Sequence, residues 1–342
     1  MNNPERGTVH DAVPDVEQQE ARAGTPKKVW QRISEQEKRL EHKKKKYAQL
    51  KKELLAAKDS AEKSDRIRRR RQKAKSLQHE VLRLRLKLRN TVRAAREQAE
   101  GDPGVGTLPD FVIIGAAKGG TTFFYNLLTR HPHVESAAFK EVHYFDLLFD
   151  EGTEAYRQCF PLPRWKDGRK TITGEATPGY LFHPHAPERM AEIVPQARLI
   201  TLLRNPVDLF YSSYQHRVRK GQEDRSFEQT VRAALNSPHE ARLVLRGIYV
   251  DHLLRWRRFF SAEQMLVLKS EDLFERPHDT LKPTLEFLDL PAWEPEASAL
   301  RSKRNKGDYE QKIDPTIRRQ LEDYFEPHNR RLYEYLGVDF GW

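Results

Sequence analysis

The sequence contains a single cysteine, Cys159, in 342 residues, and this excludes an internal disulfide framework. Cys159 has no metal-spaced partner, so we interpret it as a packing residue. No run of ~18 apolar residues occurs, which argues against a membrane-spanning helix. The opening stretch, MNNPERGTVHDAVPDVEQQE, lacks the basic-then-apolar pattern of a secretory signal. These absences predict a soluble protein of a reducing compartment.

Acidic residues are too few to balance the basic ones in the N-terminal part of the chain. The formal net charge is +11 at pH 7. Residues 1–100 contain 28 lysines and arginines against 15 acidic residues, whereas the two signs nearly balance in the remainder. We therefore expect the first hundred residues to favour acidic surfaces, while the overall charge says little about the rest.

Proline and glycine are absent from residue 30 to residue 99, a length that suits one helix or a helical hairpin. Apolar residues recur at 3-4 spacing in two stretches: Ile33, Leu40, Tyr47, Leu50, Leu54 and Ala57, then Leu77, Val81, Leu84, Leu88 and Ala95. Between them, residues 58–76 carry the basic run Arg66–Arg71. We interpret 27–100 as a basic helical region with two short coiled-coil segments around a basic break, pairing within one chain or across two. A single solvated helix is the alternative.

The rest of the chain divides by composition. Residues 1–26 combine prolines and glycines with few large apolar residues, which predicts a disordered tail. Residues 101–109 (GDPGVGTLP) are typical of a linker. From 110 to 342, expected strands (111–115, 171–174, 198–203, 265–269) alternate with expected helices (121–129, 187–194, 207–218, 227–235, 250–260, 277–287, 315–324, 328–336). This alternation predicts an α/β domain with a central parallel sheet flanked by helices.

The segment FVIIGAAKGGTTFFYNLL (Phe111–Leu128) has the order strand, glycine-rich turn, helix. Backbone N–H groups at a helix start attract an anion, and Lys118 adds a full positive charge within the turn. Glycines that permit close backbone approach and hydroxyl residues that cap a helix follow it: Gly119, Gly120, Thr121 and Thr122. The segment therefore predicts a site for a phosphate-like anion. A glycine turn chosen only for packing is the alternative.

A second cation follows the apolar segment RLITLL. Arg204 occupies the position where an ATPase would need an acidic metal ligand, and Lys118 precedes its glycine pair instead of following it as in G-x-x-x-x-G-K-[ST]. Ser212 comes about two helical turns after Arg204, so a guanidinium and a hydroxyl can converge on one phosphate. The pattern predicts a ligand with two separated anionic ends and no necessary metal. By itself, Arg-Asn-Pro is also compatible with a simple strand end.

Two more segments carry candidate chemistry. In KEVHYFD (Lys140–Asp146), Glu141 and His143 lie among apolar and aromatic residues, which suits proton transfer because burial tunes a carboxylate. The alternative is a half-buried strand or helix edge with solvated charges. In RSKRNKGDY (Arg301–Tyr309), four cations, a glycine and an aromatic predict a phosphate-binding loop with a surface for a base. An ordinary basic surface loop is the alternative.

Together these segments resemble the sulfotransferases that use 3′-phosphoadenosine-5′-phosphosulfate (PAPS), specifically the heparan sulfate N- and 3-O-sulfotransferase group and its bacterial relatives. The resemblance covers about residues 110–342 in order, including GEATPGYLF and the C-terminal EYLGVDFGW. It implies a P-loop-type sheet, PAPS as co-substrate without a required metal, and a carbohydrate or glycolipid acceptor. By position, it implies that the donor is bound by Lys118, Gly119, Gly120, Thr121, Thr122, Arg204, Ser212, Lys303, Arg304, Asn305 and Gly307.

The resemblance also implies catalytic roles. Glu141 matches the general base, which takes the proton of an acceptor hydroxyl or amine, and Lys118 would neutralise charge on the leaving phosphate oxygen. His143 matches a supporting neighbour, and His216, in YQH, matches a candidate acid or base of the N-sulfotransferase branch. Ala176 stands where the 3-O branch has a lysine. Since EVHYFD resembles the 3-O branch and SSYQH the N branch, the choice between N- and O-sulfation stays open.

Golgi members of this family carry an N-terminal membrane anchor, and this sequence has a charged helical region there, so we expect a cytoplasmic, bacterial enzyme. Self-association through residues 30–98 and contact of Arg66–Arg71 with an anionic surface are further hypotheses, with a solubilising helical surface as the alternative. Two other functions remain open: a P-loop kinase-like phosphotransferase and a non-catalytic basic coiled-coil scaffold.

Overall fold

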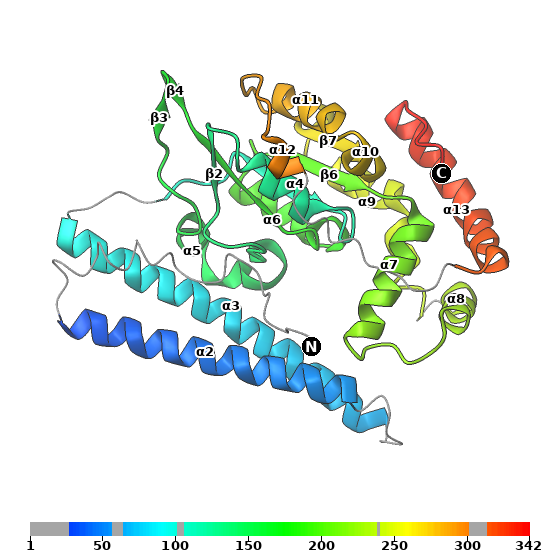
Figure 1. Cartoon of the computed structure of the whole chain (residues 1–342), viewed down its shortest axis with the longest axis horizontal. Coiled ribbons are helices and arrows are strands. Elements are labelled where there is room, and N and C mark those ends of the chain that lie inside the picture. Colours follow the sequence, from blue (N-terminus) through cyan, green and yellow to red (C-terminus); the bar gives the residue numbers. More distant parts are fainter. Residues whose placement is uncertain (1–26, 57–63, 101–105, 238–239, 301–312) are drawn as a thin grey trace.

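The computed structural model describes residues 27–56, 64–100, 106–237, 240–300 and 313–342. Within these ranges an α/β body lies beside a pair of long helices (Figure 1). The predicted tail 1–26 and the basic loop at 301–309 fall outside the described residues.

Five parallel strands form the central sheet, in the order β2-β5-β1-β6-β7. Their bounds are Val134–Ser136 (β2), Ile172–Ala176 (β5), Phe111–Gly115 (β1), Arg198–Leu203 (β6) and Met265–Lys269 (β7). The predicted parallel sheet is confirmed, and β1, β6 and β7 have the expected bounds. The sequence analysis missed β2, because a strand of three residues carries too short a pattern to be recognised.

Helices cover both faces of the sheet, because successive side chains of a strand point to opposite faces. Phe111 and Ile113 of β1 pack in one apolar cluster, and Val112 and Ile114 pack in the other. The first cluster includes residues of α4 (Thr121–Leu128), α10 (Ser270–Glu275) and α11 (Pro277–Phe287). The second includes residues of α5 (Thr153–Arg157), α6 (Ala186–Ile193), α7 (Pro206–Arg219), α8 (Phe227–Asn236), α9 (Tyr249–Trp256) and α13 (Pro315–Leu336), together with the buried Cys159.

Short elements complete the body. They are α12 (Ala297–Leu300), the hairpin of β3 (Trp165–Lys166) and β4 (Arg169–Lys170), the π-helix η2 (Tyr144–Leu148) and the 3₁₀ turns η3 (Phe149–Glu151), η4 (Tyr180–Phe182), η5 (Leu245–Gly247) and η6 (Ala262–Gln264). Of these, η2 and η4 matter most here, because they follow the candidate base segment and strand β5.

The C-terminal helix α13 corrects one expectation. Two helices were predicted around Pro327, yet α13 continues through that residue. An internal proline removes one helical hydrogen bond and crowds the preceding turn. Leu321 and Phe325 before it and Leu332 after it are all buried in the core, so packing of one helix face outweighs the local cost.

Helices α2 (Lys27–Ala56) and α3 (Ser64–Glu100) pack against each other within one chain, side by side in Figure 1. Their shared core contains Ile33, Leu40, Val81, Leu88 and Val92. The basic run 66–71 belongs to α3 and not to a break between helices, which corrects the expected boundary. None of the helices in the described ranges is long and apolar enough to span a bilayer.

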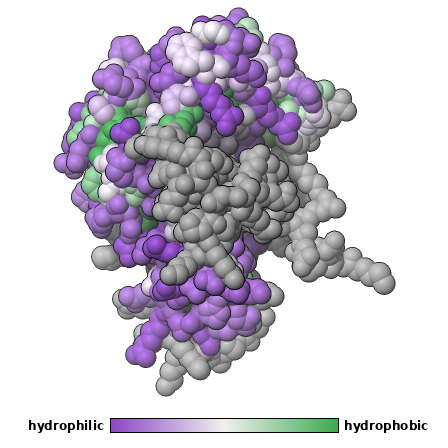
Figure 2. Space-filling model, turned by 90° about the vertical axis from the view of Figure 1, so that its left-hand side faces the viewer, coloured by the Kyte–Doolittle hydropathy of each residue, from purple (hydrophilic) through white to green (hydrophobic). Residues whose placement is uncertain are grey.

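The α2–α3 pair packs against the α/β body through α3. Leu82 and Leu86 belong to the apolar cluster of the body. Arg89 Nε donates a hydrogen bond to the carbonyl oxygen of Gln158 at 2.5 Å, and Arg83 Nε lies 2.7 Å from Glu151 Oε1. Figure 2 shows mainly hydrophilic side chains on the described lower part, where the pair lies, and small hydrophobic patches on the body above it.

Candidate active site

The candidate residues gather where the parallel strands end. The carboxyl ends of neighbouring parallel strands meet at one edge of a sheet, and ligands of open α/β folds bind there. Lys118 follows β1, Thr177 follows β5, Arg204 follows β6 and Ser270 follows β7. Because β1 pairs with β5 on one side and β6 on the other, the glycine-rich loop lies at the centre of this edge.

The glycine-rich loop needs glycine at two positions. A Cβ on Gly119 would lie 2.5 Å from the carbonyl oxygen of Leu202, so only glycine permits this approach to β6. Gly120 precedes α4 with φ of 89°, in the left-handed region. Ser270 Oγ donates a 2.6 Å hydrogen bond to the carbonyl oxygen of Gly119. The loop is therefore fixed from two strands, and the first N–H groups of α4, which lack intrahelical acceptors, begin at Thr121.

Lys118 lies in a strongly positive environment. Its backbone φ is 74°, and its carbonyl oxygen accepts a 3.3 Å hydrogen bond from Arg204 Nη1. Burial and the positive charges of Arg219, Lys220 and Arg204 lower the pKa of the Lys118 ammonium, and the Glu141 carboxylate opposes this shift. Four cations close together attract anions, so this cluster suits a multiply charged ligand.

Arg204 lies between β6 and α7, and Ser212 lies within α7, in the strand–helix order that the sequence indicated. Asn205 caps α7, since its side chain accepts hydrogen bonds from Val207 N and Asp208 N. Tyr249 Oη donates to the carbonyl oxygen of Arg204 at 2.8 Å, which fixes the backbone at the end of β6. Ser212 is buried in the second turn of α7, with 2% exposure.

Glu141 and His143 form an ion pair with two further partners. His143 Nε2 lies 3.0 Å from Glu141 Oε2, and His143 Nδ1 lies 2.9 Å from Asp146 Oδ2. Lys140 Nζ lies 3.7 Å from Glu141 Oε1. His143 has φ of 57° and directly precedes η2, and this turn brings residues on both sides of the imidazole into contact with it. The segment thus leads into a helix edge, as the alternative had it, but its charged side chains are paired with one another and not simply solvated.

The charges of this cluster have defined protonation states. Burial lowers the pKa of His143, but its hydrogen bonds to Asp146 and Glu141 outweigh burial and raise it to about 10. Burial raises the pKa of Glu141, yet the hydrogen bond from His143 and the charge of Lys140 bring it below its ordinary value. At neutral pH the cluster thus holds the His143 imidazolium beside an ionised Glu141, which is able to accept a proton.

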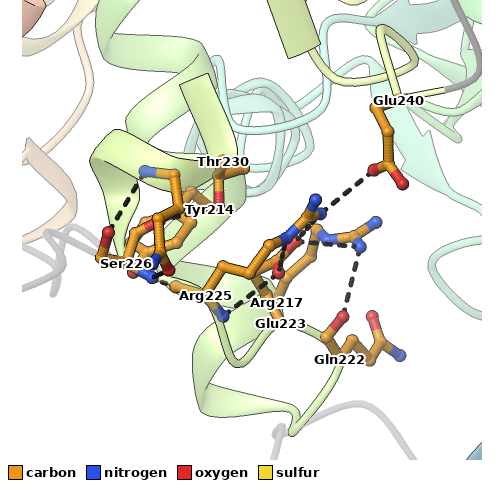
Figure 3. A network of polar contacts seen from close by, with 9 residues as sticks. Tyr214, Arg217, Gln222, Glu223, Arg225, Ser226, Thr230 and Glu240 are labelled. Carbon is orange, nitrogen blue, oxygen red and sulfur yellow. Dashed lines mark hydrogen bonds and ion pairs between the residues drawn. The ribbon is translucent and has the colours of Figure 1, made fainter. Parts of the chain in front are cut away.

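A network of ion pairs holds the turn after α7 (Figure 3). Arg225 Nε lies 2.9 Å from Glu223 Oε1, and Arg217 Nη2 lies 3.4 Å from Glu223 Oε2. Tyr214 Oη donates to the carbonyl oxygen of Arg225 at 3.0 Å. Glu223 is only 3% exposed. This network fixes the C-terminal end of α7, which carries His216, Arg219 and Lys220.

The structure places most predicted site residues at one edge of the sheet. Lys118 to Thr122, Arg204 and the Glu141–His143 pair lie there, and His216 lies in the last turns of α7. Four predicted donor contacts lie outside the described residues: Lys303, Arg304, Asn305 and Gly307. The sequence analysis missed Arg219 and Lys220, whose signal is the basic end of α7 in HRVRK.

No cluster of three or more metal-ligating side chains was found in the part of the chain that the structure describes. A hollow of about 490 Å³ lies at the opposite edge of the sheet, lined among others by Asp110, Arg198 and Leu290. None of the candidate residues lines that hollow, so it is separate from the site.

Comparisons with known proteins agree with this arrangement. The family model of the sulfotransferase domain matches residues 108–312. Human heparan sulfate glucosamine 3-O-sulfotransferase 3A1 is 31% identical over 264 residues, covering 70% of this chain and 64% of that protein. Human heparan sulfate glucosamine 3-O-sulfotransferase 6 is 30% identical over 262 residues, covering 70% and 75%. The chain therefore spans slightly less than two thirds of the first relative.

Two further similarities concern another branch and a solved structure. Bifunctional heparan sulfate N-deacetylase/N-sulfotransferase 1 of Caenorhabditis elegans is 28% identical over 260 residues, covering 67% of this chain and 30% of that protein. The crystal structure of a sulfotransferase from Alicyclobacillus acidocaldarius has 26% identity and a TM-score of 0.54, covering 68% of this chain and 98% of that one. Sequence, fold and the arrangement of the sheet edge thus agree: the chain belongs to the sulfotransferase family.

Proposed function

We propose that this protein transfers a sulfuryl group from PAPS to a hydroxyl or amine of a carbohydrate-type acceptor, with Glu141 as the general base. One observation carries the proposal: the ionised Glu141 acts electrostatically on Lys118 and its neighbouring cations at the same edge of the sheet. A base and a site for a multiply charged anion therefore lie near each other, as group transfer requires.

The donor site follows from the loop geometry. In a P-loop-type arrangement, Lys118 and the N–H groups from Gly119 to Thr122 would hold the 5′-phosphosulfate. Arg204 and Ser212 would hold the 3′-phosphate, beside the positive end of α7. Lys303, Arg304, Asn305 and Gly307 remain predicted contacts. The residues present fit the donor, because the loop accepts no side chain at Gly119 and lies beside several cations that attract anions.

The proposed reaction needs a base, a cation for the leaving group and a residue that positions the base. Glu141 takes the acceptor proton as the acceptor atom forms its bond to sulfur and the bond from sulfur to the phosphate oxygen breaks. Lys118 neutralises the charge left on that oxygen. His143, held by Asp146, orients Glu141 and keeps it ionised until the acceptor arrives. His216 stays a candidate acid or base on α7.

Positive charge next to the site favours an anionic acceptor. Arg246 of η5 lies with its Cζ 5.3 Å from the ring centre of Phe182 in η4. Burial and the charges of Arg242 and Arg217 lower the pKa of Arg246. Since η4 follows β5 at the active edge and η5 packs on α7, we infer that the acceptor binds on the side of Arg242 and Arg246. A sulfated or carboxylated glycan, as in the relatives that are named for heparan sulfate, fits this charge.

The nucleotide that binds at the donor site distinguishes a sulfotransferase from a kinase. Calorimetric titration with 3′-phosphoadenosine-5′-phosphate (PAP) without metal should give tight binding, and ATP with magnesium should bind weakly. Incubation with ³⁵S-labelled PAPS and a panel of heparan sulfate, glycolipids and small phenols, followed by mass analysis, should then identify a sulfated glycan. Tight binding of ATP–magnesium, or no PAP binding, would favour the phosphotransferase or the scaffold instead.

We further propose that α2 and α3 form a short coiled-coil extension and mediate self-association. Exposed cations of α2, among them Lys38, Arg39, Lys45 and Lys46, would also attract an acidic surface. Light scattering of the full chain at low and high salt tests the self-association. A monomer under all conditions would remove the self-association.

A further inference from the structure

A buried carboxylate lies directly beneath the proposed base segment. Glu175, in β5, is 1% exposed. Its Oε1 accepts hydrogen bonds from Tyr156 Oη at 2.8 Å and Tyr180 Oη at 3.0 Å, and its Oε2 accepts one from Thr177 Oγ1 at 2.6 Å. An isolated buried carboxylate is strongly unfavourable. The three hydroxyl donors compensate for the burial of Glu175, so we expect the fold to hold all three in place.

Two of these hydroxyls also contact the segment that carries Glu141 and His143. Thr177 Oγ1 accepts a hydrogen bond from His143 N at 3.2 Å, and Tyr180 Oη accepts one from Tyr144 N at 2.8 Å. A hydroxyl has one proton to donate. Because each hydroxyl gives its proton to Glu175, its lone pairs remain free for the backbone N–H groups of the base segment.

We infer that Glu175 is a positioning residue for the proposed reaction. As an acceptor of hydrogen bonds, it sets the direction of the Thr177 and Tyr180 hydroxyls, and these hold the backbone at 143–144. The backbone there adopts the left-handed turn at His143 that aims the imidazole at Glu141. This inference rests on the proposed function only in assigning Glu141 the role of base, since the network itself is independent of any substrate.

The same arrangement predicts sensitivity to the protonation of Glu175. Burial, opposed by its three hydroxyl donors, raises the pKa of Glu175 to about 7. A protonated carboxyl donates a hydrogen bond, so one hydroxyl must turn its own proton away, and its lone pairs are then shared between Glu175 and the backbone N–H. The titratable groups that face Glu175 from the surrounding elements are Tyr125, Lys140, His143, Tyr156, Cys159 and Tyr180.

Four variants of the full-length protein test the inference. Glu175→Gln replaces one acceptor by a donor at similar volume, and Thr177→Val removes the link to His143 N. Thr177→Ser keeps that link and serves as the rescue. Tyr125→Phe is the matched control, because Tyr125 Oη also bridges β5 to a backbone N–H, but its hydrogen bonds, donated to Gly174 O at 2.9 Å and accepted from Ala137 N at 2.8 Å, do not involve the Glu175 carboxylate.

With ³⁵S-labelled PAPS and heparan sulfate, Glu175→Gln and Thr177→Val should each lower kcat about tenfold or more through misplacement of the base, with KM for PAPS nearly unchanged. The double variant should be no worse than either single variant, because both break one connection. Thr177→Ser and Tyr125→Phe should keep kcat. A rise of kcat through pH 7 should be present in the wild type and absent in Glu175→Gln.

A second readout needs no acceptor and separates this inference from the proposed function. NMR titration of the His143 imidazole should give a lower pKa in Glu175→Gln and Thr177→Val than in the wild type and Tyr125→Phe, because the ion pair with Glu141 loosens. An unchanged His143 pKa together with unchanged kcat, or additive losses in the double variant, would overturn the inference. Absence of transfer by the wild type would refute the proposed function alone.

Discussion

At the residue scale, two glutamates near one another in the fold have opposite protonation behaviour. His143 and Lys140 bring the pKa of Glu141 below its ordinary value despite burial, whereas burial raises the pKa of Glu175 to about 7. Different partners produce this difference, because Glu141 pairs directly with cations, whereas the groups that hydrogen-bond to Glu175 are neutral hydroxyls. The proposed base is thus ionised at neutral pH, and its neighbour titrates there.

Glu141→Gln tests the base directly. The amide keeps the volume of the side chain but cannot accept the acceptor proton, so we expect kcat to fall by about a hundredfold or more. The affinity for PAP should stay within about twofold, because the phosphate sites do not involve this side chain. Radiolabel transfer and calorimetry measure the two quantities. If Glu141→Gln turns over like the wild type, Glu141 is not the base.

The pH dependence of the free energy of unfolding should reflect the titration of Glu175. Its pKa is about 7 in the folded protein against an ordinary value of 4.5, so the folded state binds more protons than the unfolded chain between these values. The free energy of unfolding contributed by this group is therefore full below pH 4.5 and falls as the pH rises to about 7. Urea denaturation should show a smaller loss between pH 5 and pH 7 for Glu175→Gln than for the wild type.

At the element scale, the glycine-rich loop depends on backbone geometry more than on side chains. Gly120 has φ of 89°, and a Cβ there would lie 2.7 Å from Phe274 Cζ. Gly168, in the β3–β4 turn, has φ of 72° with nothing within 4 Å of a Cβ. The two positions share the left-handed backbone conformation but differ in crowding and in their distance from the site.

Gly120→Ala should therefore cost more than Gly168→Ala. Both substitutions impose about 1–2 kcal/mol for a left-handed non-glycine residue, and only the first also displaces Phe274 and the loop. We expect Gly120→Ala to weaken PAP binding at least tenfold, and Gly168→Ala to leave it unchanged. Calorimetry and thermal unfolding of both variants check this. Equal PAP affinities would show that the loop does not bind the donor.

The sequence predicts those elements that depend on local patterns. Strands β1, β6 and β7 are short apolar runs between turn signals, so their bounds agree with the expectation. The glycine-rich loop and the segment containing Glu141 were also recognised as candidates. By contrast, the network of Glu175 joins the nearby residues 177 and 180 to residues 143 and 156, which lie much further away along the chain. The fold makes these longer-range contacts, and no local spacing in the sequence encodes them.

At the scale of the whole molecule, α3 contributes to two cores. Leu86 packs in the cluster of the α/β body, and Leu88 packs in the core that α3 shares with α2. Their exposures are 3% and 5%, so the two leucines are comparable in burial. They allow the two interfaces of α3 to be weakened one at a time.

Leu86→Ala and Leu88→Ala should each destabilise their own interface by about 2–5 kcal/mol. For Leu86→Ala we expect faster hydrogen exchange in α5 and in the segment around Gln158, because α3 lifts from the body. For Leu88→Ala the faster exchange should be confined to α2 and α3. Exchange detected by mass spectrometry distinguishes these outcomes, and identical patterns would mean that the helix pair and the body do not behave as separate units.

The seating of α3 has a practical consequence for anyone who shortens this protein to its catalytic part. Cutting the chain near residue 105 would strip Leu82 and Leu86 from the body and leave their apolar neighbours facing water. Such a fragment is expected to aggregate and to lose the hydrogen bond that Arg89 donates to Gln158, next to Tyr156. Low activity of the shortened protein would then reflect damage at the interface between α3 and the body, and not a direct role of the helices in the chemistry.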